Sequence, residues 1–265
     1  MPLLPDPVVA AEPPDAFAAL LQEFASRSSR FPDDFCHFFA SQGFAVLQPP
    51  TMNHRLQRAD WTLYGEWLWD ALAGLDALAE CEEIDSGRIG VVGLSTGGHL
   101  ALLAAALDAR IQSAVVAGIF STRNHIRTRF HIPPHCDCGS SQFLFAHLEP
   151  ADLAALVAPR RLQVQHGRED HVMCPGADPS RLDPRWNTGV MPSEEFAVAV
   201  REGQRDYQRM AVSERFAVHI HPGGHAVDNA AAHEWIASFG SPLPAEPEGI
   251  SAKARILPHS PGEAG

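Results

Sequence analysis

Short apolar runs alternate along the chain with longer stretches in which apolar residues recur every three or four positions. The first pattern is typical of buried strands, and the second of helices that pack on one side. Strands are predicted at residues 44–47, 89–94, 111–119, 161–166 and 216–221. Helices are predicted at residues 15–26, 33–42, 59–80, 100–107, 152–158, 193–212 and 229–239. Strands that alternate with helices indicate an α/β fold with a mostly parallel, doubly wound sheet.

A single domain is predicted for residues 1–240, because a chain of 265 residues is long enough to bury one full core. The Pro-rich start of the chain holds one weaker strand candidate, Val8–Ala11. Residues 120–150 and 172–192 are expected to be cap-like loops over the carboxyl edge of the sheet. Five prolines and scattered charges predict a mobile tail at residues 241–265.

The segment Arg88–His99 (RIGVVGLSTGGH) joins an apolar strand to an Ala/Leu-rich helix through Gly93-x-Ser95-x-Gly97. This is the G-x-S-x-G nucleophile elbow, in which a sharp turn holds a serine in a strained backbone conformation. The two glycines are expected to remove Cβ atoms that would clash in that turn. Free N–H groups and the positive dipole end of the following helix would lie beneath the Ser95 hydroxyl.

Two later turns carry the residue types that activate a serine. Asp170 follows the strand at 161–166 and a glycine, and His225 follows the last strand in the run Pro222-Gly-Gly-His225. The chain order Ser, Asp, His is that of α/β-hydrolase triads. Because parallel strands end at the same sheet edge, Ser95, Asp170 and His225 are predicted to converge there, as a nucleophile, an orienting acid and a base.

Neighbouring residues offer alternatives to both assignments. Glu169 competes with Asp170 as the acid, and Asp170 can also be an ordinary turn residue. His225 can be an ordinary loop histidine. The chain has 14 histidines, and those close to the two turns are His166, His171, His219 and His221. Of these, His219 and His221 share one face of a strand and are interpreted as packed residues.

The formal net charge of −12 disfavours nucleic acid and anionic membranes as partners. The sequence has neither a signal-peptide pattern nor an apolar run of about 18 residues, so a cytoplasmic location is predicted. The five cysteines are unevenly spaced, which argues against a secreted disulfide framework. Charge and composition do not indicate an oligomeric state.

One unusual cluster lies in the region without periodicity and consists of His131, His135, Cys136 and Cys138. These residue types ligate metals, but C-x-C is not a usual zinc spacing and no second pair is obvious. A structural loop or a pocket wall is the favoured interpretation, and a metal-binding protein is the alternative. No metal and no cofactor are assigned.

From about Asp34 to Phe239 the sequence resembles the α/β-hydrolase superfamily, in its dienelactone-hydrolase-like and acetyl-xylan-esterase-like branch. The stretches that carry the resemblance are RIGVVGLSTGGH at 88–99, HCDC at 135–138, ADLAALVAPR at 151–160, QHGRED at 165–170 and GGHAV at 223–227. The resemblance implies a serine esterase that works through an acyl-enzyme on a small-molecule carboxylic ester. It implies Ser95 as nucleophile, Asp170 as acid, His225 as base and the Thr96 N–H as one oxyanion donor. Dienelactone hydrolases proper use cysteine as nucleophile, so the serine favours ester substrates.

The N-terminal part of the chain departs from the sequence pattern of this family. Members have a strand that ends in a His-Gly loop and supplies the second oxyanion N–H, whereas no His-Gly precedes Asp33 here. Residues 1–32 are therefore a divergent segment, and the loop candidate within it is Ser26–Phe31. The alternative to an esterase is a diverged, non-catalytic α/β-hydrolase-like protein.

Overall fold

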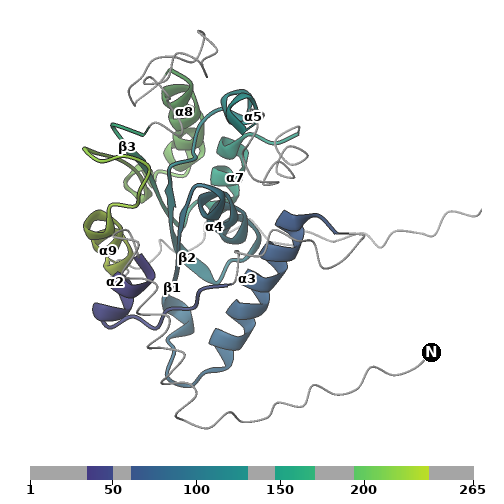
Figure 1. Ribbon diagram of the computed structural model, residues 1–265, viewed down its shortest axis with the longest axis vertical. Helices are drawn as coiled ribbons and strands as arrows, with labels where there is room; N and C mark the ends of the chain where they lie inside the picture. The colour runs from purple at the N-terminus through teal and green to yellow at the C-terminus, as the bar shows by residue number, and fades with distance from the viewer. Residues whose placement is uncertain (1–34, 50–60, 131–146, 171–193, 239–265) are drawn as a thin grey trace, which may run out of the picture.

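The computed structural model describes residues 35–49, 61–130, 147–170 and 194–238. Their centre is a four-stranded sheet in the order β1-β2-β3-β4, and every neighbouring pair is parallel (Figure 1). The strands are β1 (Ile89–Leu94), β2 (Ile111–Ala117), β3 (Arg161–Gly167) and β4 (Phe216–His221). All four strands therefore end at one edge of the sheet, which is where ligands bind in open α/β folds.

Each pair of neighbouring strands is joined by helix-bearing crossovers, as parallel pairing requires. The crossovers contain α4 (Thr96–Leu107), then α5 (Arg123–Phe130) and α7 (Pro150–Val157), then α8 (Glu194–Arg209) and η5 (Ser213–Arg215). The helices outside them are α2 (Phe35–Ser41), α3 (Leu63–Glu80), η1 (Ser86–Arg88) and α9 (Asn229–Ala237).

Helices cover both faces of the sheet, and β2 shows this most clearly. Ala114 and Val116 pack in the cluster that includes α3, α4, α7 and α8, whereas Val115 and Ala117 pack with α2 and α9. All four side chains are fully buried. In Figure 1, α2 and α9 lie together on one side of the sheet and α3 and α4 on the other. The predicted doubly wound α/β fold is confirmed.

Local sequence explains where several helices begin. Thr62 precedes α3 and its hydroxyl accepts the Gly65 N–H at 3.1 Å. Asp228 precedes α9 and accepts the Ala231 N–H at 3.2 Å. Such side-chain caps satisfy N–H groups that have no partner within the helix.

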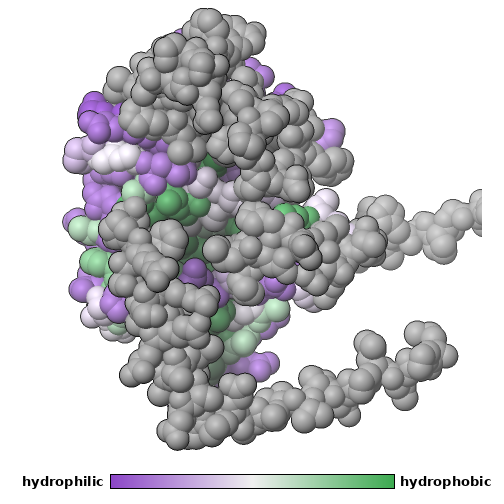
Figure 2. Space-filling view, viewed as in Figure 1, coloured by the Kyte–Doolittle hydropathy of each residue, from purple (hydrophilic) through white to green (hydrophobic). Residues whose placement is uncertain are grey.

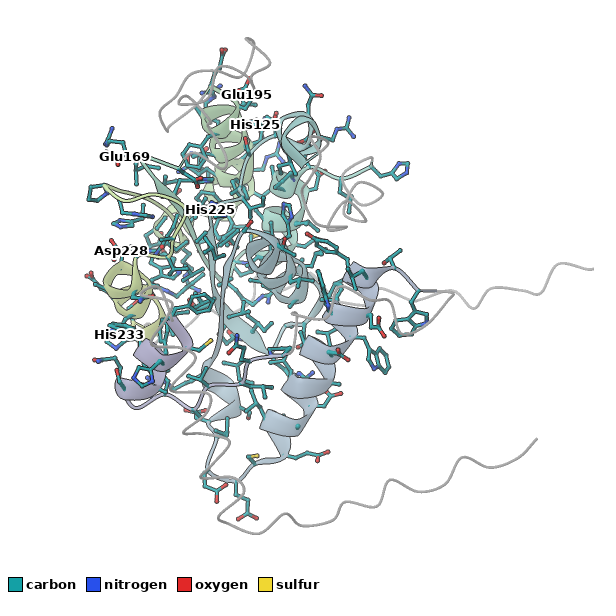
Figure 3. The ribbon with its side chains drawn as sticks, viewed as in Figure 1. His125, Glu169, Glu195, His225, Asp228 and His233 are labelled. Carbon is teal, nitrogen blue, oxygen red and sulfur yellow. The ribbon has the colours of Figure 1, made fainter. Side chains whose placement is uncertain are left out.

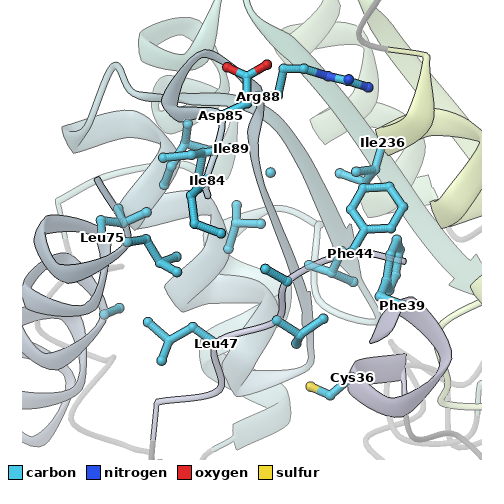
Figure 4. Close-up of a pocket in the computed structure, with 18 of the residues that line it drawn as sticks. Cys36, Phe39, Phe44, Leu47, Leu75, Ile84, Asp85, Arg88, Ile89 and Ile236 are labelled. Carbon is cyan, nitrogen blue, oxygen red and sulfur yellow. The ribbon is translucent and has the colours of Figure 1, made fainter. Parts of the chain in front are cut away.

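The predicted strand at 44–47 is wrong. Residues 44–49 form no strand, and Val46 and Leu47 are 41% and 47% exposed. A cavity of about 520 Å³ is bounded by this segment on one side and by Gly90, Val91 and Val92 of β1 on the other (Figure 4). An apolar run becomes a strand only when a neighbouring strand lies close enough to complete a hydrogen-bond ladder.

Other boundaries differ less. β2 ends at Ala117 rather than at residue 119, because Gly118 turns the chain with a φ of +66°. Helix α8 ends at Arg209 rather than at residue 212, and Ala211 follows it at a φ of +56°. Helix α5 lies in the region predicted to be a loop.

The predicted strand at 8–11, the helix at 15–26, the loop at 172–192 and the tail at 241–265 lie outside the described residues. Among the helices that the structure describes, none combines the length and the hydrophobicity needed to cross a bilayer.

Candidate active site

Ser95 occupies the turn between β1 and α4 in a conformation that L-residues rarely adopt, with φ 56° and ψ −120°. Its N–H donates to the carbonyl of Ala117 at 2.8 Å, and its carbonyl accepts the His99 N–H at 3.1 Å. These bonds hold the strained residue between the end of β2 and the first turn of α4. Persistent strain of this kind clusters at functional sites.

The glycines around the turn have different roles from those predicted. A Cβ at Gly93 would clash with the backbone carbonyl of Gly97, so a side chain is excluded there. A Cβ at Gly97 would meet no other atom within 4 Å, which corrects the expectation that both glycines avoid a clash. Gly98 is the second tight position, because its Cβ would lie 2.9 Å from the Ala117 carbonyl.

Asp170 and His225, which are 55 residues apart in the chain, are hydrogen-bonded to each other. The His225 Nδ1 atom lies 3.0 Å from both carboxylate oxygens of Asp170. The Asp170 side chain is fully buried, whereas that of His225 is 19% exposed. Because an ionised carboxylate only accepts hydrogen bonds, Nδ1 carries the proton, and Nε2 of the neutral imidazole is left as an acceptor.

The competing acid, Glu169, is exposed, and Figure 3 shows it at the margin of the molecule while His225 lies further inside. Its backbone N–H donates to the Gly223 carbonyl at 3.0 Å. The hydrogen bond to His225 therefore involves Asp170 and not Glu169.

Close backbone packing brings the two turns together. A Cβ at Gly167 would clash with the carbonyls of Gly223 and Gly224, so the turn after β4 rests directly on the end of β3. The Arg168 N–H donates to the His221 carbonyl at 2.8 Å and extends the contact between the strands. Gly167 thus permits the approach that places His225 beside Asp170.

The turn after β2 also lies against the His225 ring. A Cβ at Gly118 would lie 2.8 Å from His225 Cε1 and 3.0 Å from the side chain of Leu94, the residue before Ser95. The Gly118 N–H donates to the Gln165 carbonyl at 2.9 Å, which continues the ladder between β2 and β3. The His225 ring therefore lies at the edge of the sheet where β1 ends and Ser95 follows.

The other candidate residues have local partners or are not described. His219 pairs with Asp228 at 2.8 Å, and the His221 Nε2 lies 3.2 Å from the Ala226 carbonyl. Burial raises the pKa of Asp228, but hydrogen bonds from His219 and Ala231, together with the charges of His219 and His221, lower it overall. His171, the loop at 26–31 and the cluster His131, His135, Cys136 and Cys138 lie outside the described residues. Within the described ranges, His, Cys, Asp and Glu side chains form no group of three that could hold a metal.

Two buried polar contacts near this edge were not predicted from the sequence. The Ser121 hydroxyl lies 2.7 Å from His125 Nδ1, and both residues are almost fully buried. His166 Nε2 lies 3.0 Å from the Phe120 carbonyl. A histidine at the end of a strand signals proximity to the site, but the carbonyl that it contacts is 46 residues away and is set by the tertiary fold.

The cavity beside β1 is separate from this site. Its lining includes Phe39, Phe44, Leu75 and Ile236 but none of Ser95, Asp170 or His225 (Figure 4). Figure 2 shows hydrophobic surface in the middle of the molecule, between segments drawn in grey.

Residues 51–123 match the family model of acetyl xylan esterases, a segment that contains Ser95 and the whole of β1, α4 and β2. The Bacillus subtilis (strain 168) protein YtaP, a hydrolase by its name, is 28% identical over 154 residues. That alignment covers 57% of this chain and 47% of YtaP, so the chain spans about half the length of this curated relative.

The fold is similar to that of solved carbohydrate esterases. A family 15 glucuronoyl esterase from Caldicellulosiruptor kristjansonii superposes with a TM-score of 0.50 at 22% identity, covering 67% of this chain and 49% of that one. A glucuronoyl esterase from Solibacter usitatus gives a TM-score of 0.51 at 17% identity, covering 75% of this chain and 52% of that one. At these identities the likeness concerns the fold. The parallel sheet with its strained serine turn therefore has the fold of these α/β-hydrolase-like esterases, and residues 51–123 are similar to acetyl xylan esterases.

Proposed function

We propose that this protein is a serine hydrolase that cleaves carboxylic esters through an acyl-enzyme. The observation that carries the proposal is the hydrogen bond between the buried Asp170 and His225, at the sheet edge where the Ser95 turn also lies. A serine hydroxyl is a weak nucleophile unless a base takes its proton, and that base needs an orienting acid. The proposed roles are nucleophile for Ser95, base for His225 and orienting acid for Asp170.

In the first half of the reaction, Ser95 Oγ bonds to the carbonyl carbon of the ester and its proton passes to His225 Nε2. The tetrahedral intermediate collapses, the bond to the leaving alkoxide breaks, and Nε2 returns the proton to form the alcohol. Asp170 stays ionised and holds the Nδ1–H throughout. Water then attacks the acyl-enzyme with the same base, and the carboxylic acid leaves.

The oxyanion that forms in each half of the reaction needs hydrogen-bond donors. Thr96 begins α4, so its N–H has no partner within the helix and is the proposed donor. The loss of one such donor typically slows kcat by about 10²–10³. The segment expected to supply a second donor, Ser26–Phe31, lies outside the described residues.

The proposed substrate class is a short-chain acyl ester of a carbohydrate. The match of residues 51–123 to acetyl xylan esterases supports an acetyl group, and no step of the mechanism calls for a cofactor. The alignment covers only 47% of the curated relative, so that relative does not support a substrate for this chain. The proposed substrate rests on the matched segment alone.

Steady-state hydrolysis of p-nitrophenyl acetate, butyrate and octanoate, with acetylated xylo-oligosaccharides in parallel, tests this proposal. The wild type should turn over the acetate ester fastest, and Ser95→Ala should reduce kcat by at least about 10³. A wild type that is folded by circular dichroism but no faster than Ser95→Ala on every ester would refute the proposal in favour of a non-catalytic protein.

A further inference from the structure

His166 lies beside the proposed triad of Ser95, Asp170 and His225 but is not one of its members. It is the penultimate residue of β3, its side chain is fully buried, and it lies near two segments that adjoin the His225 ring. On one side, His166 Nε2 lies 3.0 Å from the carbonyl of Phe120, in the turn after β2. On the other, His166 Nδ1 lies 3.9 Å from Asp170 Oδ2.

The contact with Phe120 determines which nitrogen carries the proton. A carbonyl oxygen only accepts hydrogen bonds, so Nε2 must be the donor, and Nδ1 of the neutral ring is then unprotonated. At 3.9 Å from Asp170, Nδ1 is beyond hydrogen-bond distance, and no donor among the described residues reaches it. With this tautomer of the neutral ring, His166 does not compete with His225 for the carboxylate of Asp170.

The same bond fixes the turn on which His225 rests. Gly118 lies against the His225 ring, and Phe120 is two residues further along the same turn. The Phe120 ring is itself anchored, because it packs against Phe216 of β4 with the ring centroids 6.1 Å apart. His166 thus joins the end of β3, three residues before Asp170 in the following turn, to the backbone segment that lies against His225.

We propose that His166 is a positioning residue for the Asp170–His225 pair. Its Nε2–H holds the turn after β2 against the His225 ring, and its unprotonated Nδ1 does not compete with His225 for Asp170. This inference rests on the proposed serine hydrolase function. It adds a fourth side chain that acts through Asp170 and His225 and does not touch the substrate.

Two substitutions separate the hydrogen bond from simple packing. His166→Phe keeps a ring of similar size but removes the donor, and it should lower kcat at least tenfold with KM changed less than threefold. His166→Gln offers an amide N–H that can reach the Phe120 carbonyl, and it should recover a kcat several-fold above that of His166→Phe. As the matched control, Phe196→Leu removes the ring that packs on His166 at 4.8 Å but leaves both imidazole nitrogens, and kcat should stay within threefold.

Nitrogen NMR of the histidine rings tests the proposal without activity. In the wild type, the His166 signals, assigned by their loss in His166→Gln, should show a proton on Nε2 and none on Nδ1. The Nδ1–H proton of His225 should be visible in the wild type and in Phe196→Leu, and lost by exchange in His166→Phe. A proton on His166 Nδ1, or a His225 proton that persists unchanged in folded His166→Phe, would overturn the proposal.

These readouts also separate this inference from the proposed function. If the wild type hydrolyses no ester, the hydrolase proposal fails, and the two NMR measurements still decide the role of His166. If the wild type is active but His166→Phe and His166→Gln both keep kcat within threefold, the hydrolase proposal stands and the role of His166 is refuted.

Discussion

At the scale of single residues, burial and hydrogen bonding distinguish side chains of the same chemical type. Asp170 and Glu169 are adjacent carboxylates, but only Asp170 is buried and bonded to an imidazole. The sequence predicted Asp170 from its place after a strand and a glycine, and the structure places it beside His225. The backbone contacts that distinguish it from Glu169 depend on the turn after β4, which lies more than 50 residues later and has no local sequence signal.

The first prediction follows from this difference. Asp170→Asn should lower kcat on the best ester by roughly 10³–10⁴, because an amide in place of the carboxylate no longer fixes the His225 tautomer. Glu169→Gln is the matched control at the neighbouring exposed position, and its kcat should stay within about twofold of the wild type. Equal losses in the two variants would show that Asp170 is not the orienting acid.

The second prediction concerns His99 and the pH dependence of stability. It lies in α4, is 2% exposed, and its Nδ1 is 3.5 Å from the Tyr64 hydroxyl of α3. Burial lowers the pKa of His99 from 6.5 to about 3, because the charged imidazolium is poorly solvated there. Below pH 6.5 the unfolded chain therefore binds a proton at His99 that the folded chain does not, and the folded state loses stability as the pH falls from about 6.5 towards 3.

The size of this effect can be measured against His99→Gln, which cannot titrate. Between pH 7 and pH 5 the wild type should lose about 2 kcal/mol more of its unfolding free energy than the variant, from urea denaturation at each pH. Identical pH dependence in the two proteins would show that His99 is protonated as easily in the folded chain as in the unfolded one.

At the scale of elements, the strand–turn–helix unit of β1, Ser95 and α4 is the part that the sequence predicts best. The apolar run, the glycine spacing and the Ala/Leu-rich helix are all local, so they agree without tertiary information. Which glycine is sterically required was not predictable, because it depends on how closely Gly93 approaches the backbone at Gly97 and how Gly98 meets β2. These distances arise only when the unit is packed.

The third prediction compares Gly93, where a side chain is excluded, with Gly97, where the neighbouring space is open. Gly93→Ala should destabilise the protein by at least about 3 kcal/mol or prevent folding, because its Cβ would clash with a backbone carbonyl that cannot move away. Gly97→Ala should change stability by no more than about 1 kcal/mol, because the space beside it is open and alanine favours a helix. Urea midpoints of the two variants provide the comparison, and similar destabilisation by both would contradict the geometry described for the turn.

At the scale of the whole molecule, the sequence predicts the layers of the fold but not the outer edge of β1. Four of the five predicted strands lie in the sheet, because buried parallel strands are continuous apolar runs that are easy to recognise. The run at 44–47 is also apolar, but it pairs with no strand in the part of the chain that the structure describes. A cavity of about 520 Å³ lies beside β1 in its place. An apolar run becomes a strand only beside a partner strand, and the hydrophobicity of the run does not indicate whether that partner is present.

The central claim of the account is that the Ser95 turn, Asp170 and His225 form one catalytic unit, and a fluorophosphonate probe tests this claim most directly. After labelling of the whole chain and peptide mapping by mass spectrometry, the account predicts one modified serine, Ser95. The label should be absent in Ser95→Ala and at least about 10²-fold slower in His225→Gln, because the serine hydroxyl then lacks its base. Ser121, which lies 2.7 Å from His125 but is fully buried, is the internal comparison and should stay unmodified. A folded wild type that takes up no label, or one labelled at Ser121 instead of Ser95, would contradict the account.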